Sequence, residues 1–128
     1  MSPRFEIALP TRPVLSHAAD GVRANGLLFV AGVLPVDMGG MLVGAGDVDE
    51  QARHVFAALG EILDAAGCSR RDVAWVNVYL TAIEDRSRVE AQLQTAFSGS
   101  RPAGTLVCVR GLAIPGAGIE IDAVAAVP

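Results

Sequence analysis

The sequence predicts an α+β domain in which one mixed sheet carries two helices on one face, in the order ββαβαββ. Three observations support this prediction: a hairpin signal at Asn25-Gly26, an amphipathic helical pattern over about residues 48–66, and an alternating β-branched segment over about residues 73–81. A length of 128 residues is typical of a single domain. We therefore expect residues 1–128 to form one domain around one core.

The hairpin is expected where the segments at 19–24 and 27–34 flank the Asn25-Gly26 dipeptide. Asparagine and glycine accept the two positive φ angles that a type I′ turn requires. The segment "GVRANGLLFVAGVLPV" therefore predicts two antiparallel strands joined by a tight turn.

The helix over about 48–66 has signals at both ends. Asp47 is the expected N-cap and Glu50 follows three residues later, as in a capping box, while Gly67 is a natural αL cap. Its apolar residues recur at helical spacing and predict one buried face: Val48, Ala52, Val55, Phe56, Leu59, Ile62, Leu63 and Ala66.

The second half of the chain alternates strand and helix patterns. A strand is expected at about 73–81, a more polar helix at about 84–97, and two closing strands at about 104–110 and 118–127. Because helices between strands imply crossover connections, we expect the strands around the first helix to be parallel neighbours. If both helices cover one face of the sheet, the other face stays uncovered and apolar, and we expect oligomerisation to bury it.

The second helix is expected to bury three apolar residues, Val89, Leu93 and Phe97.

The composition narrows the functional classes. Mean hydropathy is +0.43, yet no run reaches the roughly 18 apolar residues of a membrane span, so we expect no membrane partner. The net charge is −4 and the ten basic residues are scattered, which argues against a nucleic-acid partner. The segment "MSPRFEIALP" lacks a secretory pattern, so the expected location is cytoplasmic. The spacing of Cys68 and Cys108 predicts neither a disulfide framework nor a metal site.

Several segments together resemble one known family. "VRANGLLFVAGVLPVD", "DVDEQARHVFAALGEILDAAGCSRRDVAWVNVYLT", "RPAGTLVCV" and "GIEIDAVA", within residues 16–127, are similar to the signature segments of the Rid family, also called YjgF/YER057c/UK114. The resemblance implies a chorismate-mutase-like fold and a homotrimer with an inner β-barrel and small-molecule pockets between subunits. It also implies cofactor-independent hydrolysis of reactive enamines and imines to a keto acid and ammonia.

The resemblance assigns site residues around the "RPAGTLVCV" strand. The arginine that binds the substrate carboxylate in the family's "PAR[ST]" pattern corresponds to Gly104, and the family's cysteine corresponds to Leu106. Arg101 and Arg110 are the nearby alternatives for a guanidinium. The family's water-activating glutamate corresponds to Glu120, which is therefore the candidate catalytic residue.

Further pocket positions lie in the first half of the chain. Ala31 stands where many members have a ligand-binding serine or threonine, and Gly32 follows it as in the family. The family's pocket tyrosine corresponds to Ala18 or, in a shifted alignment, to Leu15. His17 is a candidate for proton transfer, although a lone loop histidine is more often a surface residue.

The altered positions predict a changed pocket. Glu90 replaces an asparagine on the second helix; if it faces Glu120, one carboxyl could be a general acid and the other a base. An exposed helix position for Glu90 is the alternative. Cys108 is expected to be a buried structural thiol. Two interpretations of Gly104 are open: it replaces the family's arginine and leaves space in the pocket, or it permits close contact between strands or subunits.

These residues predict a divergent Rid-type enzyme that acts on an enamine, imine or related electrophile with Glu120, without carboxylate recognition. The alternative is a non-catalytic ligand-binding or regulatory trimer. A standard 2-iminoacid deaminase is disfavoured by Gly104, and an endoribonuclease is disfavoured by the acidic chain without a basic stripe.

Overall fold

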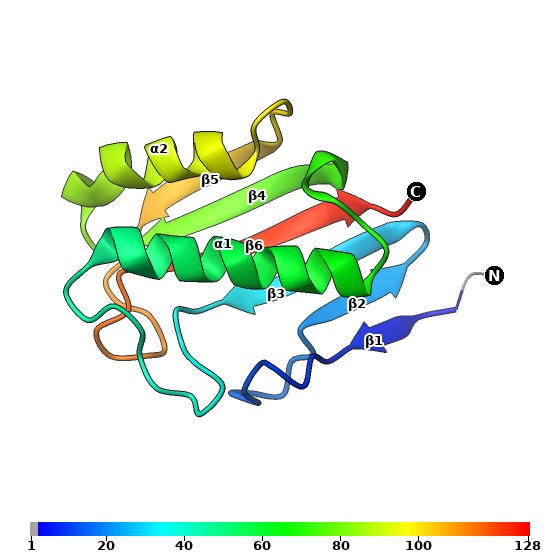
Figure 1. Cartoon of the computed structure of the whole chain (residues 1–128), viewed down its shortest axis with the longest axis horizontal. Coiled ribbons are helices and arrows are strands. Elements are labelled where there is room, and N and C mark those ends of the chain that lie inside the picture. Colours follow the sequence, from blue (N-terminus) through cyan, green and yellow to red (C-terminus); the bar gives the residue numbers. More distant parts are fainter. Residues whose placement is uncertain (1–2) are drawn as a thin grey trace.

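The computed structural model describes residues 3–128 and has two helices packed on one face of a six-stranded sheet (Figure 1). This arrangement confirms the predicted α+β class. Short 3₁₀ turns at Arg70–Asp72 and Ile83–Asp85 precede the fourth strand and the second helix. The elements are β1 (Phe5–Ile7), β2 (Gly21–Ala24), β3 (Leu27–Val33), α1 (Val48–Ala65), β4 (Val73–Leu80), α2 (Arg86–Ala96), β5 (Ala103–Cys108) and β6 (Ile119–Ala126).

The strand order is β1-β2-β3-β6-β4-β5, which corrects the expected neighbours of the first crossover. The strand β6 lies between β3 and β4 and is antiparallel to both, so β3 and β4 are parallel but not adjacent. The parallel neighbours are β4 and β5, which flank α2. A crossover helix determines strand direction, but it leaves room for a later strand to insert between the two strands that it connects.

Two further comparisons concern the start of the sheet. The turn between β2 and β3 has positive φ at both Asn25 (52°) and Gly26 (76°), as predicted for the hairpin. The sequence did not predict β1, which pairs with β2 over three residues. A three-residue edge strand is too short to display an alternating pattern.

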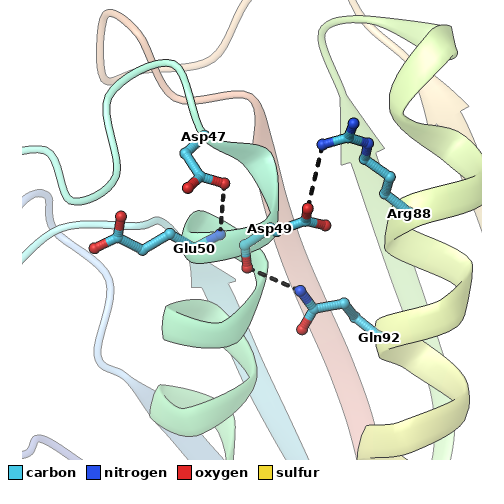
Figure 2. Close-up of polar contacts among 5 residues, drawn as sticks. All are labelled: Asp47, Asp49, Glu50, Arg88 and Gln92. Carbon is cyan, nitrogen blue, oxygen red and sulfur yellow. Dashed lines mark hydrogen bonds and ion pairs between the residues drawn. The ribbon is translucent and has the colours of Figure 1, made fainter.

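The helix α1 begins and ends where its caps predict. The Asp47 carboxylate accepts a hydrogen bond from the Glu50 backbone N–H (3.1 Å; Figure 2). Gly67 has a φ of 75°, which suits the chain reversal after the helix. Gln51 is 2% exposed, and its side-chain amide binds Gly118 and two other loop residues.

Polar contacts tie α2 to the first turn of α1. Arg88 donates to the Asp49 carboxylate (3.2 Å), and the Gln92 side chain donates to the Asp49 carbonyl oxygen (2.9 Å; Figure 2). Val89 is fully buried, and Phe97 contacts Phe56 edge to face at the end of α2. The two helices therefore form one layer that covers the sheet.

The core lies between this layer and one face of the sheet, where β6 contributes Ile119, Ile121, Ala123 and Ala125. The opposite face has no helix over it (Figure 1). Four large apolar side chains of that open face stay substantially exposed: Leu27, Phe29, Trp75 and Val107. Within residues 3–128, none of the helices has the length and apolar character needed to cross a membrane.

Candidate functional site

The predicted site residues fall into two groups on opposite faces of the sheet. Glu120 and Gly32 lie together on the open face, because Glu120 alternates with the buried Ile119 and Ile121 of β6. Gly104, Leu106 and Glu90 line a cleft between α2 and β5 on the helix-covered side. Within one chain the sheet separates the two groups.

The Glu120 carboxylate rests directly on the backbone of Gly32. A Cβ atom at Gly32 would occupy the position of Glu120 Oε2, so the missing side chain permits this close approach. The register of β3 against β6 shifts between Val30 and Val33, which places Gly32 in a bulge, and the Glu120 side chain lies over this bulge. The bulge and the missing side chain together make room for the carboxyl group.

A second carboxylate, Asp122, lies on the same face and was missed by the sequence analysis. Its Oδ1 accepts a hydrogen bond from Asn77 Nδ2 (2.8 Å), and its Oδ2 accepts one from the Tyr79 hydroxyl (2.9 Å). Trp75 Nε1 donates to Asn77 Oδ1 (2.7 Å) and completes the network. The strand alternation that places residues 120 and 122 on one face could have identified Asp122.

The environment of this cluster raises the pKa of two groups. Partial burial and then the charge of Asp122 raise the pKa of Glu120 above its ordinary value. The hydrogen bond to Asp122 is the largest cause that raises the pKa of Tyr79, followed by burial. Within residues 3–128, no cation forms an ion pair with the Glu120 carboxylate. Glu120 is thus a partly buried carboxyl that takes up a proton more readily than usual.

The cleft between α2 and β5 has a volume of about 960 Å³ and is open to solvent. Arg101 lines it, whereas Arg110 is not among its lining residues. Glu90 lies at its rim and forms an exposed ion pair with Arg86 on the next turn of α2 (3.0 Å). Within one chain, the carboxylate beside Glu120 is therefore Asp122 and not Glu90.

The backbone at Gly104 leaves no room for a side chain. A Cβ atom there would collide with the backbone carbonyl oxygen of Val76 on β4. This contact supports the interpretation that the glycine permits close strand approach; an arginine at this position would require β5 to move away from β4. Leu106, two residues later, packs partly against the core.

The remaining predicted residues lie apart from the cleft. Ala31 precedes Gly32 on β3, and its N–H donates to the Asp20 carbonyl oxygen (3.0 Å). His17 and Ala18 are exposed in the loop before β2. Cys108 is exposed at the end of β5, so the expectation of a buried thiol is wrong. An edge strand has only one neighbour to cover it, which explains the exposure.

Comparisons with known proteins agree with this fold and these segments. The family model described as Endoribonuclease L-PSP matches residues 11–127. The 3-aminoacrylate deaminase RutC of Acinetobacter baylyi is 36% identical over 122 residues, which cover 94% of this chain and 96% of that protein.

Two solved structures support the same relationship. A protein of the conserved Rid family from Yersinia pestis superposes with a TM-score of 0.91 at 26% identity, covering 98% of this chain and 100% of that one. A member of the YjgF/YER057c/UK114 family from Mycobacterium tuberculosis superposes with a TM-score of 0.82 at 27% identity, with the same coverage. The chain therefore belongs to the Rid family, which the Endoribonuclease L-PSP model describes and which is also called YjgF/YER057c/UK114.

Proposed function

We propose that this protein is a cofactor-independent cytoplasmic hydrolase of the Rid type, that it processes an enamine- or imine-like electrophilic metabolite, and that Glu120 is its catalytic residue. The observation that carries the proposal is the Glu120 carboxyl group, which lies over the Gly32 backbone with a raised pKa. A carboxyl group with a raised pKa holds a proton more readily than an ordinary carboxyl group, and it can therefore act as a proton donor as well as a proton acceptor.

The proposed reaction uses both forms of Glu120. Protonated Glu120 donates its proton to the enamine carbon, and the nitrogen lone pair forms the C=N bond of an iminium ion. The Glu120 carboxylate then takes a proton from water as the water oxygen bonds to the iminium carbon. The same carboxyl protonates the amine of the resulting carbinolamine, and the C–N bond breaks as the hydroxyl oxygen forms a C=O double bond to the same carbon. The hydroxyl proton returns to Glu120, so one water is consumed and one ammonia is released.

We propose further that the working pocket forms between subunits of a homotrimer. The two groups of site residues lie on opposite faces of one chain, so a single chain does not assemble them. The exposed apolar side chains of the open face are typical of an interaction surface. In the trimer that the family resemblance implies, the α2–β5 cleft of one chain would meet the open face of the next.

The trimer can be tested with a matched pair of substitutions. Phe29 is 45% exposed on the open face, and Phe5 is 55% exposed on the outer strand β1. We expect Phe29→Lys to convert a species of three chains, each of 13.2 kDa, into monomers, as measured by analytical ultracentrifugation. Phe5→Lys should leave the mass unchanged. A wild-type monomer would contradict the trimer.

The substrate is proposed to lack a carboxylate that the protein must recognise. The relative named 3-aminoacrylate deaminase acts, by its name, on a carboxylate-bearing enamine. This chain has no side chain at residue 104, and the two guanidinium groups that line the cleft belong to the exposed Arg101 and to the exposed Arg86, which is paired with Glu90. The two carboxylates on the open face favour a neutral or cationic ligand. We do not extend the endoribonuclease description to this chain, because its net charge of −4 gives a poor phosphate-binding surface.

The decisive experiment is the rate of ammonia release from freshly generated imines. The imine of leucine is compared with the imine of leucinamide, which lacks the carboxylate, in buffer, with the protein and with Glu120→Gln. We expect the protein to accelerate hydrolysis of the leucinamide imine more strongly, and Glu120→Gln to abolish the acceleration. The contrary outcome is that neither imine is hydrolysed faster than in buffer, while an added metabolite raises the Tm of the wild type and of Glu120→Gln equally. The protein would then be a non-catalytic ligand-binding trimer and not an enzyme.

A further inference from the structure

We propose that Asp122 is a positioning residue whose carboxylate is held beside Glu120 by hydrogen bonds from Asn77 and Tyr79. Its negative charge makes Glu120 the proton donor of these two neighbouring carboxyl groups. Asp122 would also stabilise the positive charge of an iminium ion through its fixed negative charge. This inference rests on the proposed function for its role in catalysis. Its electrostatic part concerns the ground state of the protein and is measured separately.

The antiparallel register of β4 and β6 builds this arrangement. Asn77 is the cross-strand partner of Asp122, and Tyr79 is the partner of Glu120. Trp75 Nε1 can only donate, so the Asn77 amide must turn its oxygen towards Trp75 and its NH₂ group towards Asp122. The tryptophan thus sets the orientation of the amide that holds the aspartate.

The hydrogen bonds distinguish the two carboxyl groups. Both oxygens of Asp122 accept hydrogen bonds from protein donors, an arrangement that suits an ionised carboxylate. Glu120 rests on the backbone of Gly32, and its carboxylate accepts no hydrogen bond from another group within residues 3–128. Of two neighbouring carboxyl groups, the one without donors is the one that binds the proton.

Among the residues that the structure describes, no positive charge acts on Glu120 to offset that of Asp122. On its own strand β6, the charged neighbour of Glu120 is Asp122; on β4 its titratable neighbour is Tyr79, and on β3 it contacts Gly32. Residues two apart on a strand are separated by about 7 Å on one face, close enough for a partly buried pair to interact. Burial and the charge of Asp122 both raise the pKa of Glu120.

The test follows the Glu120 carboxyl carbon by ¹³C NMR as a function of pH. In Asp122→Asn the charge is removed, while the side-chain oxygen can still accept from Asn77. The matched control is Asp64→Asn, which removes an exposed carboxylate on α1, on the other side of the sheet. We expect the Glu120 titration midpoint to fall in Asp122→Asn and to stay unchanged in Asp64→Asn.

A second variant guards against a folding defect. Tyr79→Phe removes one donor to Asp122 and keeps the aromatic ring, so we expect the Glu120 midpoint to fall in this variant as well. The inference is overturned if the Glu120 midpoint is the same in Asp122→Asn as in the wild type. It is also overturned if the Glu120 midpoint is unchanged in Tyr79→Phe.

Kinetics separate this inference from the proposed function. If the protein hydrolyses imines, the high-pH limb of its rate profile should move to lower pH in Asp122→Asn but not in Asp64→Asn. If the NMR midpoint moves while the wild type has no activity, the electrostatic role of Asp122 is supported and the hydrolase proposal fails. An active enzyme whose pH limb does not move would overturn the role of Asp122 in catalysis.

Discussion

Replacement of Gly104 by alanine tests the close contact between β4 and β5. The added Cβ would collide with the backbone carbonyl oxygen of Val76, and a backbone atom cannot turn aside as a flexible side chain can. Overpacking of this kind costs about 1–3 kcal/mol. Alanine restricts the unfolded chain and recovers about 0.4–1 kcal/mol. We therefore expect Gly104→Ala to lower the free energy of unfolding by about 1–2 kcal/mol.

The assay is thermal unfolding followed by circular dichroism at one protein concentration. With an unfolding entropy of roughly 2.1 cal/mol/K per residue, a chain of 128 residues loses about 4 °C per kcal/mol. The expected drop in Tm is therefore about 4–8 °C. Gly111→Ala is the matched control, because a Cβ at Gly111 meets no atom within 4 Å. The control should stay within about 0.5 kcal/mol of the wild type.

A Gly104→Ala variant as stable as the control would refute this reasoning. It would mean that β5 moves away from β4 at little cost, and that residue 104 can accept a side chain. The same outcome would support the other interpretation, in which Gly104 replaces a carboxylate-binding arginine and leaves space in the pocket. In that case Gly104→Arg should bind carboxylate-bearing imines without loss of stability.

Three further predictions concern stability. Because the pKa of Glu120 is raised in the folded state, this group stabilises the fold below its ordinary pKa of 4.5, and that stabilisation is lost as the pH rises through the folded-state pKa. Glu120→Gln should therefore have a larger free energy of unfolding than the wild type at pH 7.5, and the difference should shrink at pH 4. Gln51→Leu should lower the free energy of unfolding in urea by about 2–3 kcal/mol, because the Gly118 N–H and two loop carbonyl groups lose their hydrogen-bond partner. Arg88→Ala should cost less than about 0.5 kcal/mol in the same assay, because its ion pair with Asp49 is solvent-exposed, and a larger loss would mean that this contact holds α2 in place.

Local sequence patterns predicted the elements that carry their own signals. Asn25-Gly26 produced the expected turn, and Asp47 with Gly67 bounded α1, because each of these residues acts on the backbone beside it. The strand β1 carries no such signal and was missed. The exposure of Cys108 was also missed, because alternation cannot reveal that a strand lies at the edge of a sheet.

The candidate site could be predicted only in part, because local sequence patterns do not reveal which strands are neighbours. Glu120 could be placed on a face opposite the core because its neighbours in β6 are apolar. The sequence left open whether Glu90 faces Glu120 or lies exposed on its helix; in the structure Glu90 is paired with the exposed Arg86, and the carboxylate near Glu120 is Asp122. Proximity across a sheet depends on which strands pair and in which register, and the spacing within one segment carries neither piece of information.

The sequence by itself determined the identity of the helices and most strands, the family, and the residue types available for chemistry. Only the tertiary structure decided that β6 inserts between β3 and β4. That insertion brings Glu120 onto Gly32 and aligns Asp122 with Asn77. Turns and caps are local and follow from a few neighbouring residues, whereas strand order and register follow from packing the whole sheet against its helices.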